Sequence, residues 1–202
     1  MTTFLLATRN RHKVREFRRI FKKLPVRFVT VDAVPKLPPV RETGKTFRAN
    51  AVKKAVQSSR HTNLPVIAED SGLEVKALGG RPGVKSARFA GAAQNDQANL
   101  DKLIRLMRRV PFSKRQARFV CAIAVARSGK LLKTVEEICD GSLSFAAMGE
   151  TGFGYDPIFV PEGYSKTNAQ LGARVKDSIS HRARALRRLA PFIKGFREYP
   201  AG

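Results

Sequence analysis

The chain has 202 residues, 43% of them hydrophobic, and this length suits one large domain or two small lobes that share a core. That apolar content, with 13 Phe, excludes wholesale disorder, and no apolar run reaches the roughly 18 residues that a membrane helix needs. Lys and Arg number 39 against 16 Asp and Glu, so the formal net charge is +23 and polyanions are the partners that charge favours.

The N-terminus and the two cysteines indicate the compartment. The first residues form no basic stretch followed by a long apolar segment, so the sequence predicts no secretory signal and a cytoplasmic location. Cys121 and Cys139 form no Cys-x-x-Cys pair and have no His at zinc spacing. We therefore expect two thiols in a reducing compartment, with a disulfide as the alternative.

Hydrophobic periodicity and glycine or proline breaks define the expected elements. The first part of the chain is expected to contain a strand at residues 4–8, a helix at 11–23, a strand at 26–31, a loop at 35–39 and a helix at 46–60. The middle part is expected to contain a strand at 66–68, a glycine-rich loop at 72–91, a helix at 97–110, and strands at 118–126 and 131–137 joined as a hairpin. The last part is expected to contain a strand at 143–148, a glycine-rich turn at 152–157, a strand at 158–160 and a helix at 178–196. This order predicts an α/β fold with a mixed sheet, part parallel and part antiparallel.

Basic residues concentrate in three stretches, residues 9–23, 102–118 and 174–188, each of which overlaps a predicted helix. A solvated basic helix face and a polyanion-binding surface both explain them. No aromatic residues alternate with the charges as in an RNA-stacking platform, and no helix-turn-helix or zinc-finger spacing is present. The sequence leaves both interpretations open.

Acids are scarce, so their positions are informative. Glu42 follows a proline-rich loop, and Glu69 and Asp70 follow a predicted buried strand at Ala-Glu-Asp-Ser-Gly. A carboxylate at a strand end, joined by a second from a neighbouring loop, suits Mg²⁺, which takes few carboxylates and completes its shell with waters and phosphates. An ordinary turn at Asp-Ser-Gly is the alternative.

Three further segments have the residues to bind a nucleotide. Residues 8–13 precede a predicted helix, where backbone N–H groups and Lys13 favour a phosphate, and an ordinary N-cap by Asn10 is the alternative. In residues 152–157, Phe153 is placed to stack on a base and Asp156 to accept a hydrogen bond; a tight turn with core aromatics is the alternative. Lys176, His181 and Arg182 group donors near a helix start, where a helix-cap role is the alternative for His181.

Together these segments resemble the inosine triphosphate pyrophosphatase family, also called the Ham1-like family. The matching blocks occur in the family's order and span nearly the whole chain, at residues 6–13, 42–55, 68–91, 152–159 and 179–186. The resemblance implies an elongated mixed, twisted sheet with flanking helices, in which two lobes of one domain (residues 1–202, without an independent linker) surround a central substrate cleft. It implies a homodimer and the Mg²⁺-dependent hydrolysis of ITP, dITP and XTP to the monophosphate and pyrophosphate, which sanitises the nucleotide pool.

The resemblance also implies residue roles. Glu42 and Asp70 hold Mg²⁺, and Asp70 is the general base for the attacking water. The substrate contacts it implies are Thr8, Arg9, Asn10, Arg11, His12 and Lys13 on the triphosphate, Ser71, the base-binding turn of Phe153, Gly154, Tyr155 and Asp156, and Lys176, His181 and Arg182.

The chain departs from the family pattern at four positions. Arg41, Ala49 and Gln170 stand where the family commonly has an acid, and Glu69 stands where it commonly has Asp. These departures leave the number of metal ions open. A basic nucleic-acid-binding protein that keeps the fold without catalysis is a second hypothesis, which the presence of Glu42 and Asp70 disfavours. An isolated interaction module is a third and has only the basic helices in its favour. An enzyme with weak, non-specific polyanion binding combines the first two.

Overall fold

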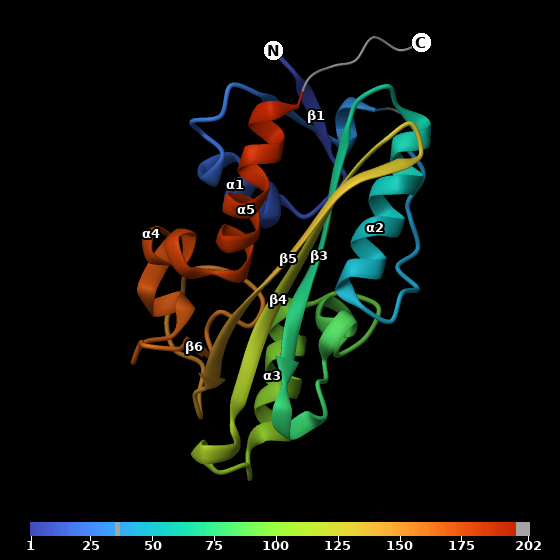
Figure 1. Cartoon of the computed structure of the whole chain (residues 1–202). Coiled ribbons are helices and arrows are strands. Elements are labelled where there is room, and N and C mark those ends of the chain that lie inside the picture. Colours follow the sequence, from blue (N-terminus) through green and yellow to red (C-terminus); the bar gives the residue numbers. More distant parts are fainter. Residues whose placement is uncertain (35–36, 197–202) are drawn as a thin grey trace. The chain divides into compact units, whose positions relative to one another are not determined.

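The structure is a computed structural model that describes residues 1–34 and 37–196 (Figure 1). Its strands are β1 (Thr3–Leu6), β2 (Arg27–Thr30), β3 (Val66–Val75), β4 (Gln116–Arg127), β5 (Lys130–Leu143) and β6 (Phe159–Pro161). Its helices are α1 (Arg11–Ile20), α2 (Phe47–Ser58), α3 (Asp96–Met107), α4 (Asn168–Ile179) and α5 (His181–Gly195). The loop predicted at residues 35–39 falls partly on residues 35 and 36, which lie outside the described residues.

The six strands form one mixed sheet in the order β2-β1-β3-β4-β5-β6. β1 pairs in parallel with β2, with Phe4 opposite Phe28, and in parallel with β3, with Leu5 opposite Val66. β5 and β6 pair in antiparallel fashion, with Leu143 opposite Phe159. The predicted α/β class with a mixed sheet is confirmed, while the single-domain boundary and the central cleft stay predictions.

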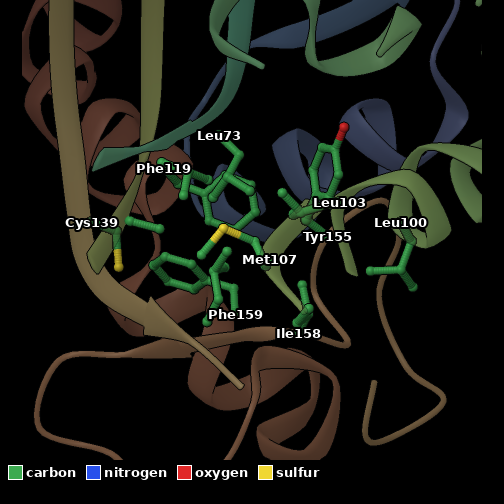
Figure 2. Packing of buried hydrophobic residues seen from close by; sticks show 12 residues of the cluster. Leu73, Leu100, Leu103, Met107, Phe119, Cys139, Tyr155, Ile158 and Phe159 are labelled. Carbon is green, nitrogen blue, oxygen red and sulfur yellow. The ribbon is translucent and has the colours of Figure 1, made fainter. Parts of the chain in front are cut away.

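The chain divides into two compact units. Unit 1 comprises residues 1–70, 122–136 and 184–202, and unit 2 comprises residues 71–121 and 137–183. The core of unit 2 includes Leu73, Leu103, Phe119 and Phe159, all of which are buried (Figure 2). In unit 1 the buried residues of β1, such as Leu5, fill the corresponding core.

The hairpin of β4 and β5 has a two-residue turn. Ser128 and Gly129 both adopt positive φ, 49° and 75°. Positive φ at both central positions is the geometry of a type I′ turn, whose twist matches that of the flanking strands. The predicted hairpin is confirmed, although both strands are longer than the sequence pattern indicates.

β3 continues well beyond its predicted end at residue 68. The Ala-Glu-Asp-Ser-Gly segment is extended strand rather than a turn, so Glu69 and Asp70 lie within β3 and not at its end. Gly72 suggested a loop, but the strand needs glycine there because a Cβ would lie 2.8 Å from the carbonyl oxygen of Gly83. The predicted loop at residues 72–91 was therefore wrong in its first residues.

The strand predicted at residues 143–148 is absent from the described residues, because β5 ends at Leu143. The side chain of Arg115, only 1% exposed, donates hydrogen bonds to backbone carbonyls that would otherwise pair with a neighbouring strand. Its Nε donates to the carbonyl of Leu143 (2.8 Å) and its Nη2 donates to that of Ser144 (2.7 Å). Burial lowers the pKa of the Arg115 guanidinium, and backbone oxygens stabilise its charge.

The helix predicted at residues 178–196 is confirmed as α5, although α5 begins at His181 and residues 178 and 179 are the end of α4. α5 follows Ser180, whose extended backbone separates it from α4 and whose Oγ accepts a hydrogen bond from the N–H of Ala183 (3.2 Å). Sequence reasoning missed α4, which begins at a capping box: Gln170 Oε1 accepts from the N–H of Thr167 (2.9 Å). Gln170 stands where the family commonly has an acid, and its side chain serves the capping box as an acid would.

None of the helices in the described ranges combines the length and hydropathy that crossing a bilayer requires. The thiols of Cys121 and Cys139 are both buried.

Candidate active site

The turn between β1 and α1 is closed by the side chain of Asn10. Its Oδ1 accepts hydrogen bonds from the backbone N–H groups of His12 (2.9 Å) and Lys13 (3.1 Å). Thr8 Oγ1 accepts one from the N–H of Asn10 (3.2 Å). The N-cap alternative is therefore confirmed, and Asn10 satisfies two donors that an anion at this helix start would otherwise use. Contact of residues 8–13 with a triphosphate stays a prediction that rests on their cationic side chains.

Those cationic side chains differ in exposure. Arg9 and Arg11 are exposed, whereas the Lys13 side chain is 16% exposed. Its Nζ lies 3.3 Å from Oε1 of Glu69, a carboxylate that is 2% exposed on β3. This ion pair holds the Lys13 ammonium beside the strand that carries Asp70.

Asp70 is a buried carboxylate, 6% exposed, whose Oδ2 accepts a hydrogen bond from Asn50 Nδ2 (2.9 Å). Burial raises the pKa of Asp70 above its ordinary value of 3.8, and the positive charge of Lys13 partly opposes this. The negative charge of Glu42 raises the pKa as well, which places that carboxylate within electrostatic range. Asp70 is therefore a stronger proton acceptor than an exposed aspartate.

Two residues of α2, Asn50 and Lys54, hold this acidic region together. Asn50 Oδ1 accepts a hydrogen bond from the N–H of Gly44 (2.7 Å), so one amide fixes both the buried carboxylate and the segment after Glu42. Lys54 Nζ forms an ion pair with Glu42 and donates to the carbonyl of Glu69 (3.0 Å). Sequence reasoning missed both residues. The pattern that could have indicated them is an Asn and a Lys four residues apart, and so on one face of the helix that follows Glu42.

Glu42 and Asp70 fit a magnesium ion by their chemistry. Mg²⁺ takes one or two carboxylates and fills its shell with waters and phosphate oxygens. Over residues 1–34 and 37–196, no cluster of three His, Cys, Asp or Glu is arranged to hold a metal by itself. After burial, the charge of Glu42 is a further cause of the raised pKa of Asp70, and a bound divalent cation would relieve that repulsion, so this carboxylate pair suits such an ion.

In unit 2, the turn after Gly152 closes around the carboxylate of Asp156. Its Oδ2 accepts hydrogen bonds from the N–H of Phe153 (2.9 Å) and from Lys176 Nζ (2.6 Å), and its Oδ1 accepts one from Asn168 Nδ2 (3.2 Å). Gly152 has φ of 86°, and a Cβ there would collide with this carboxylate. The sequence did not indicate Asn168, and the structure makes Asp156 the centre of the turn.

The ring of Phe153 lies beside two cations. Lys176 Nζ is 4.5 Å and Arg182 Cζ is 5.7 Å from the ring centroid. Arg182 is 1% exposed, and its Nη2 donates a hydrogen bond to Ser71 Oγ (3.0 Å). The structure thus brings four predicted substrate contacts, Ser71, Phe153, Lys176 and Arg182, into one group.

His181 opens α5 and stacks on Phe119, with ring centroids 4.7 Å apart and 10° between the planes. It is 4% exposed. Because Ser180 caps α5, the helix-cap alternative for His181 is wrong. Its contact with substrate stays a prediction.

The remaining residues of the turn have different environments. The N–H of Gly154 donates to Asp96 Oδ2 (3.1 Å). Tyr155 is 4% exposed, its hydroxyl donates to the carbonyl of Ser86 (2.9 Å), and it belongs to the core of unit 2 (Figure 2). Burial raises the pKa of Tyr155, and the charge of Asp96 adds to that rise. The core-aromatic alternative is confirmed for Tyr155.

Comparison with known proteins places the chain. A model of the Ham1 family matches residues 4–192. The chain belongs to the Ham1 family. A dITP/XTP pyrophosphatase of Geobacillus kaustophilus (strain HTA426) is 50% identical over 189 residues, which cover 94% of this chain and 93% of that protein.

Solved Ham1 structures have the same fold. The Staphylococcus aureus Ham1 protein has a TM-score of 0.85 at 37% identity, covering 96% of this chain and 99% of that one. A HAM1 protein from Coxiella burnetii has a TM-score of 0.86 at 33% identity, covering 97% and 100%. The family resemblance of the sequence is confirmed.

Proposed function

We propose that this Ham1-family chain hydrolyses the non-standard purine nucleoside triphosphates ITP, dITP and XTP to the monophosphate and pyrophosphate. The observation that carries the proposal is the buried Asp70 carboxylate, whose pKa is raised by burial and by the charge of Glu42. The relative named a dITP/XTP pyrophosphatase, half identical over 94% of this chain, supports the substrate class.

Asp70 is the proposed general base. It accepts a proton from a water that attacks the α-phosphorus; a new P–O bond forms, the bridging bond to the β-phosphate breaks, and pyrophosphate leaves. Asn50 holds the carboxylate in place through its hydrogen bond. A positioned base contributes about 10²–10⁴-fold, so neutralisation of phosphate charge must supply most of the acceleration.

The triphosphate carries close to four negative charges, which the start of α1 meets with Lys13 and the exposed Arg9 and Arg11. Mg²⁺, held by Glu42 and Asp70, supplies Lewis-acid stabilisation of the phosphoryl oxygens when it is bound. Lys54 keeps Glu42 placed through their ion pair. These residues bind and orient the phosphates.

Unit 2 is proposed to recognise the base. The purine stacks on Phe153, and Lys176 and Arg182 at that ring are donors suited to the 6-oxo oxygen of hypoxanthine or xanthine. Adenine has an amino group at that position, and each buried donor left unpaired costs about 1–3 kcal/mol. Asp156 acts by fixing Lys176 and the Phe153 backbone.

The deciding experiment measures pyrophosphate release from ITP, XTP and ATP, with and without Mg²⁺. The expected result is rapid release from ITP and XTP that needs Mg²⁺, and slow release from ATP. Asp32→Asn, at an exposed aspartate of unit 1, is the matched control and is expected to leave the rates unchanged. Equal and negligible rates on all three substrates would remove the proposal.

Two further expectations belong with this function: a homodimer and a cytoplasmic location. Light scattering coupled to size-exclusion chromatography tests the first, and a mass of one chain at micromolar concentration would refute it. Fractionation of the source cells tests the second.

A further inference from the structure

Two helices of unit 1 cover one face of the β1–β2 pair. Phe4 and Phe28 lie opposite each other in the sheet register and therefore on the same face. Phe21, directly after α1, stacks on Phe28 with ring centroids 5.6 Å apart. Phe196, directly after α5, packs on Phe4 at 5.1 Å. α1 and α5 (blue and red in Figure 1) thus share a supporting layer, and both helices also carry exposed residues.

The solvent sides of these helices are basic. We call the basic helix surface the exposed cations of α1 beyond its first residue, of the turn that follows α1 and of α5, namely Arg15, Arg18, Arg19, Lys22, Lys23, Arg184, Arg187, Arg188 and Lys194. Glu16, the one acid within α1, is 6% exposed and faces inward, and α5 contains no acid. Within the described part of both helices, no exposed carboxylate interrupts the surface.

This arrangement opposes helix formation. Arg15 and Arg19, and likewise Arg184 and Arg188, are like charges at i, i+4, which repel. A bound polyanion would neutralise these charges and relieve the repulsion.

We propose that the basic helix surface binds the phosphate backbone of a nucleic acid duplex, as a function separate from nucleotide hydrolysis. A duplex presents closely spaced phosphates that exposed Arg and Lys side chains contact without reading sequence. Two cationic helices on one supporting layer present such contacts over an extended area.

The basic helix surface lacks the exposed aromatic and apolar side chains that binding to a single strand or to a membrane requires. Single strands bind through aromatic stacking, and among residues 1–34 and 37–196 the exposed large hydrophobic side chains all lie off both helices: Met1, Leu106, Phe112, Leu131, Leu132, Phe145, Met148 and Tyr164. Membrane-surface helices insert an apolar face. Here the apolar residues of α1 and α5, such as Phe17 and Leu189, are buried in unit 1.

Fluorescence anisotropy of a labelled 20-base-pair DNA or RNA duplex tests the proposal on the full chain. Affinity should fall about 10³–10⁵-fold between 50 and 200 mM salt, as for six to ten phosphate contacts, with little dependence on base sequence. No binding at 50 mM salt would overturn the proposal.

Matched variants locate the contact. The first replaces four cations of the surface, Arg18→Gln, Lys22→Gln, Arg187→Gln and Lys194→Gln. The control makes the same change in net charge at four exposed lysines elsewhere, Lys85→Gln, Lys130→Gln, Lys133→Gln and Lys166→Gln. The salt slope should drop by about one for each surface substitution that removes a phosphate contact and should stay constant in the control. Equal drops in both variants would overturn the proposal, and ITP hydrolysis should be unchanged in both.

A second measurement does not depend on variants. Bound duplex should protect Lys22 and Lys194 from acetylation while Lys85 and Lys166 stay reactive, and equal protection at all four would overturn the assignment. Binding to phosphatidylserine vesicles at a salt concentration that releases the duplex would overturn it in favour of a membrane surface.

Discussion

The buried carboxylates Asp70 in unit 1 and Asp156 in unit 2 have different surroundings. Asp156 accepts hydrogen bonds from a buried ammonium, an amide and a backbone N–H, and it thereby shapes the turn that carries Phe153. Asp70 has its pKa raised by burial and by the charge of Glu42. Asp156 therefore fixes the geometry of its turn, whereas Asp70 has the raised pKa that the proposed general base requires, although sequence alone gives both as candidate site residues.

Removal of the base should have the largest effect. Asp70→Asn keeps the shape and burial of the side chain but removes the proton acceptor and a metal-binding oxygen, so we expect kcat for ITP to fall by at least about 10²–10⁴-fold. Steady-state pyrophosphate release measures it, with Asp32→Asn as the control. Near-normal turnover would mean that Asp70 is not the base and that the contrast with Asp156 is false.

Disruption of the Asp156 ion pair should act on stability first. Lys176→Met leaves a buried carboxylate without its ammonium partner, so the free energy of unfolding should fall by about 3–5 kcal/mol. Urea denaturation measures this, and Lys166→Met, at an exposed lysine, should change it by less than about 0.5 kcal/mol. The double variant Lys176→Met/Asp156→Asn should lose less than the sum of its parts. A loss as small as the control's would show that Asp156 does not depend on Lys176.

Removal of the Asn10 N-cap should have a smaller effect on stability, and the N-cap Asn95 of α3 provides a matched control. Asn10→Ala and Asn95→Ala each remove an N-cap side chain, at α1 and α3, and each should cost about 1 kcal/mol of stability. Only Asn10→Ala should also change KM for ITP, because residues 8–13 are proposed to hold the triphosphate. Equal KM values in the two variants would remove the loop from the proposed site.

The raised pKa of Asp70 predicts the smallest change, in stability against pH. Well below pH 3.8 the carboxyl is protonated in both the folded and unfolded states, so no ionised group is buried on folding. As pH rises from 3.8 through the raised folded value, the unfolded state ionises more readily, so the protein loses stability. Without Mg²⁺, Asp70→Asn should therefore be more stable than the unmodified protein at pH 7 and equally stable well below 3.8. Urea midpoints against pH measure this, and a less stable variant at pH 7 would contradict the direction of the shift.

The fold class and the family could be predicted from the sequence, because the order of the elements and of the motif blocks carries that information. The same motifs mark Glu42, Asp70 and Phe153 as candidate site residues, and their roles stay predictions. The extent of β3 was missed because Gly72 resembles a turn residue until Gly83 is known to approach it closely. Local patterns do not show such distant neighbours.

Partners from distant parts of the chain were missed for the same reason. Two of the carbonyls bound by Arg115 lie 28 and 29 residues along the chain, and Asn50 is 20 residues from Asp70. Arg115 appeared in the sequence as one more member of a basic run, whereas the fold buries it. Composition indicated a cationic surface but not which cations are exposed.

The most direct test of the central claim is hydrolysis of ITP in ¹⁸O-labelled water with Mg²⁺, with both products analysed by mass spectrometry. Attack of the Asp70-activated water at the α-phosphorus predicts one labelled oxygen in the monophosphate and none in the pyrophosphate. Label in the pyrophosphate, or in released inorganic phosphate, would contradict it.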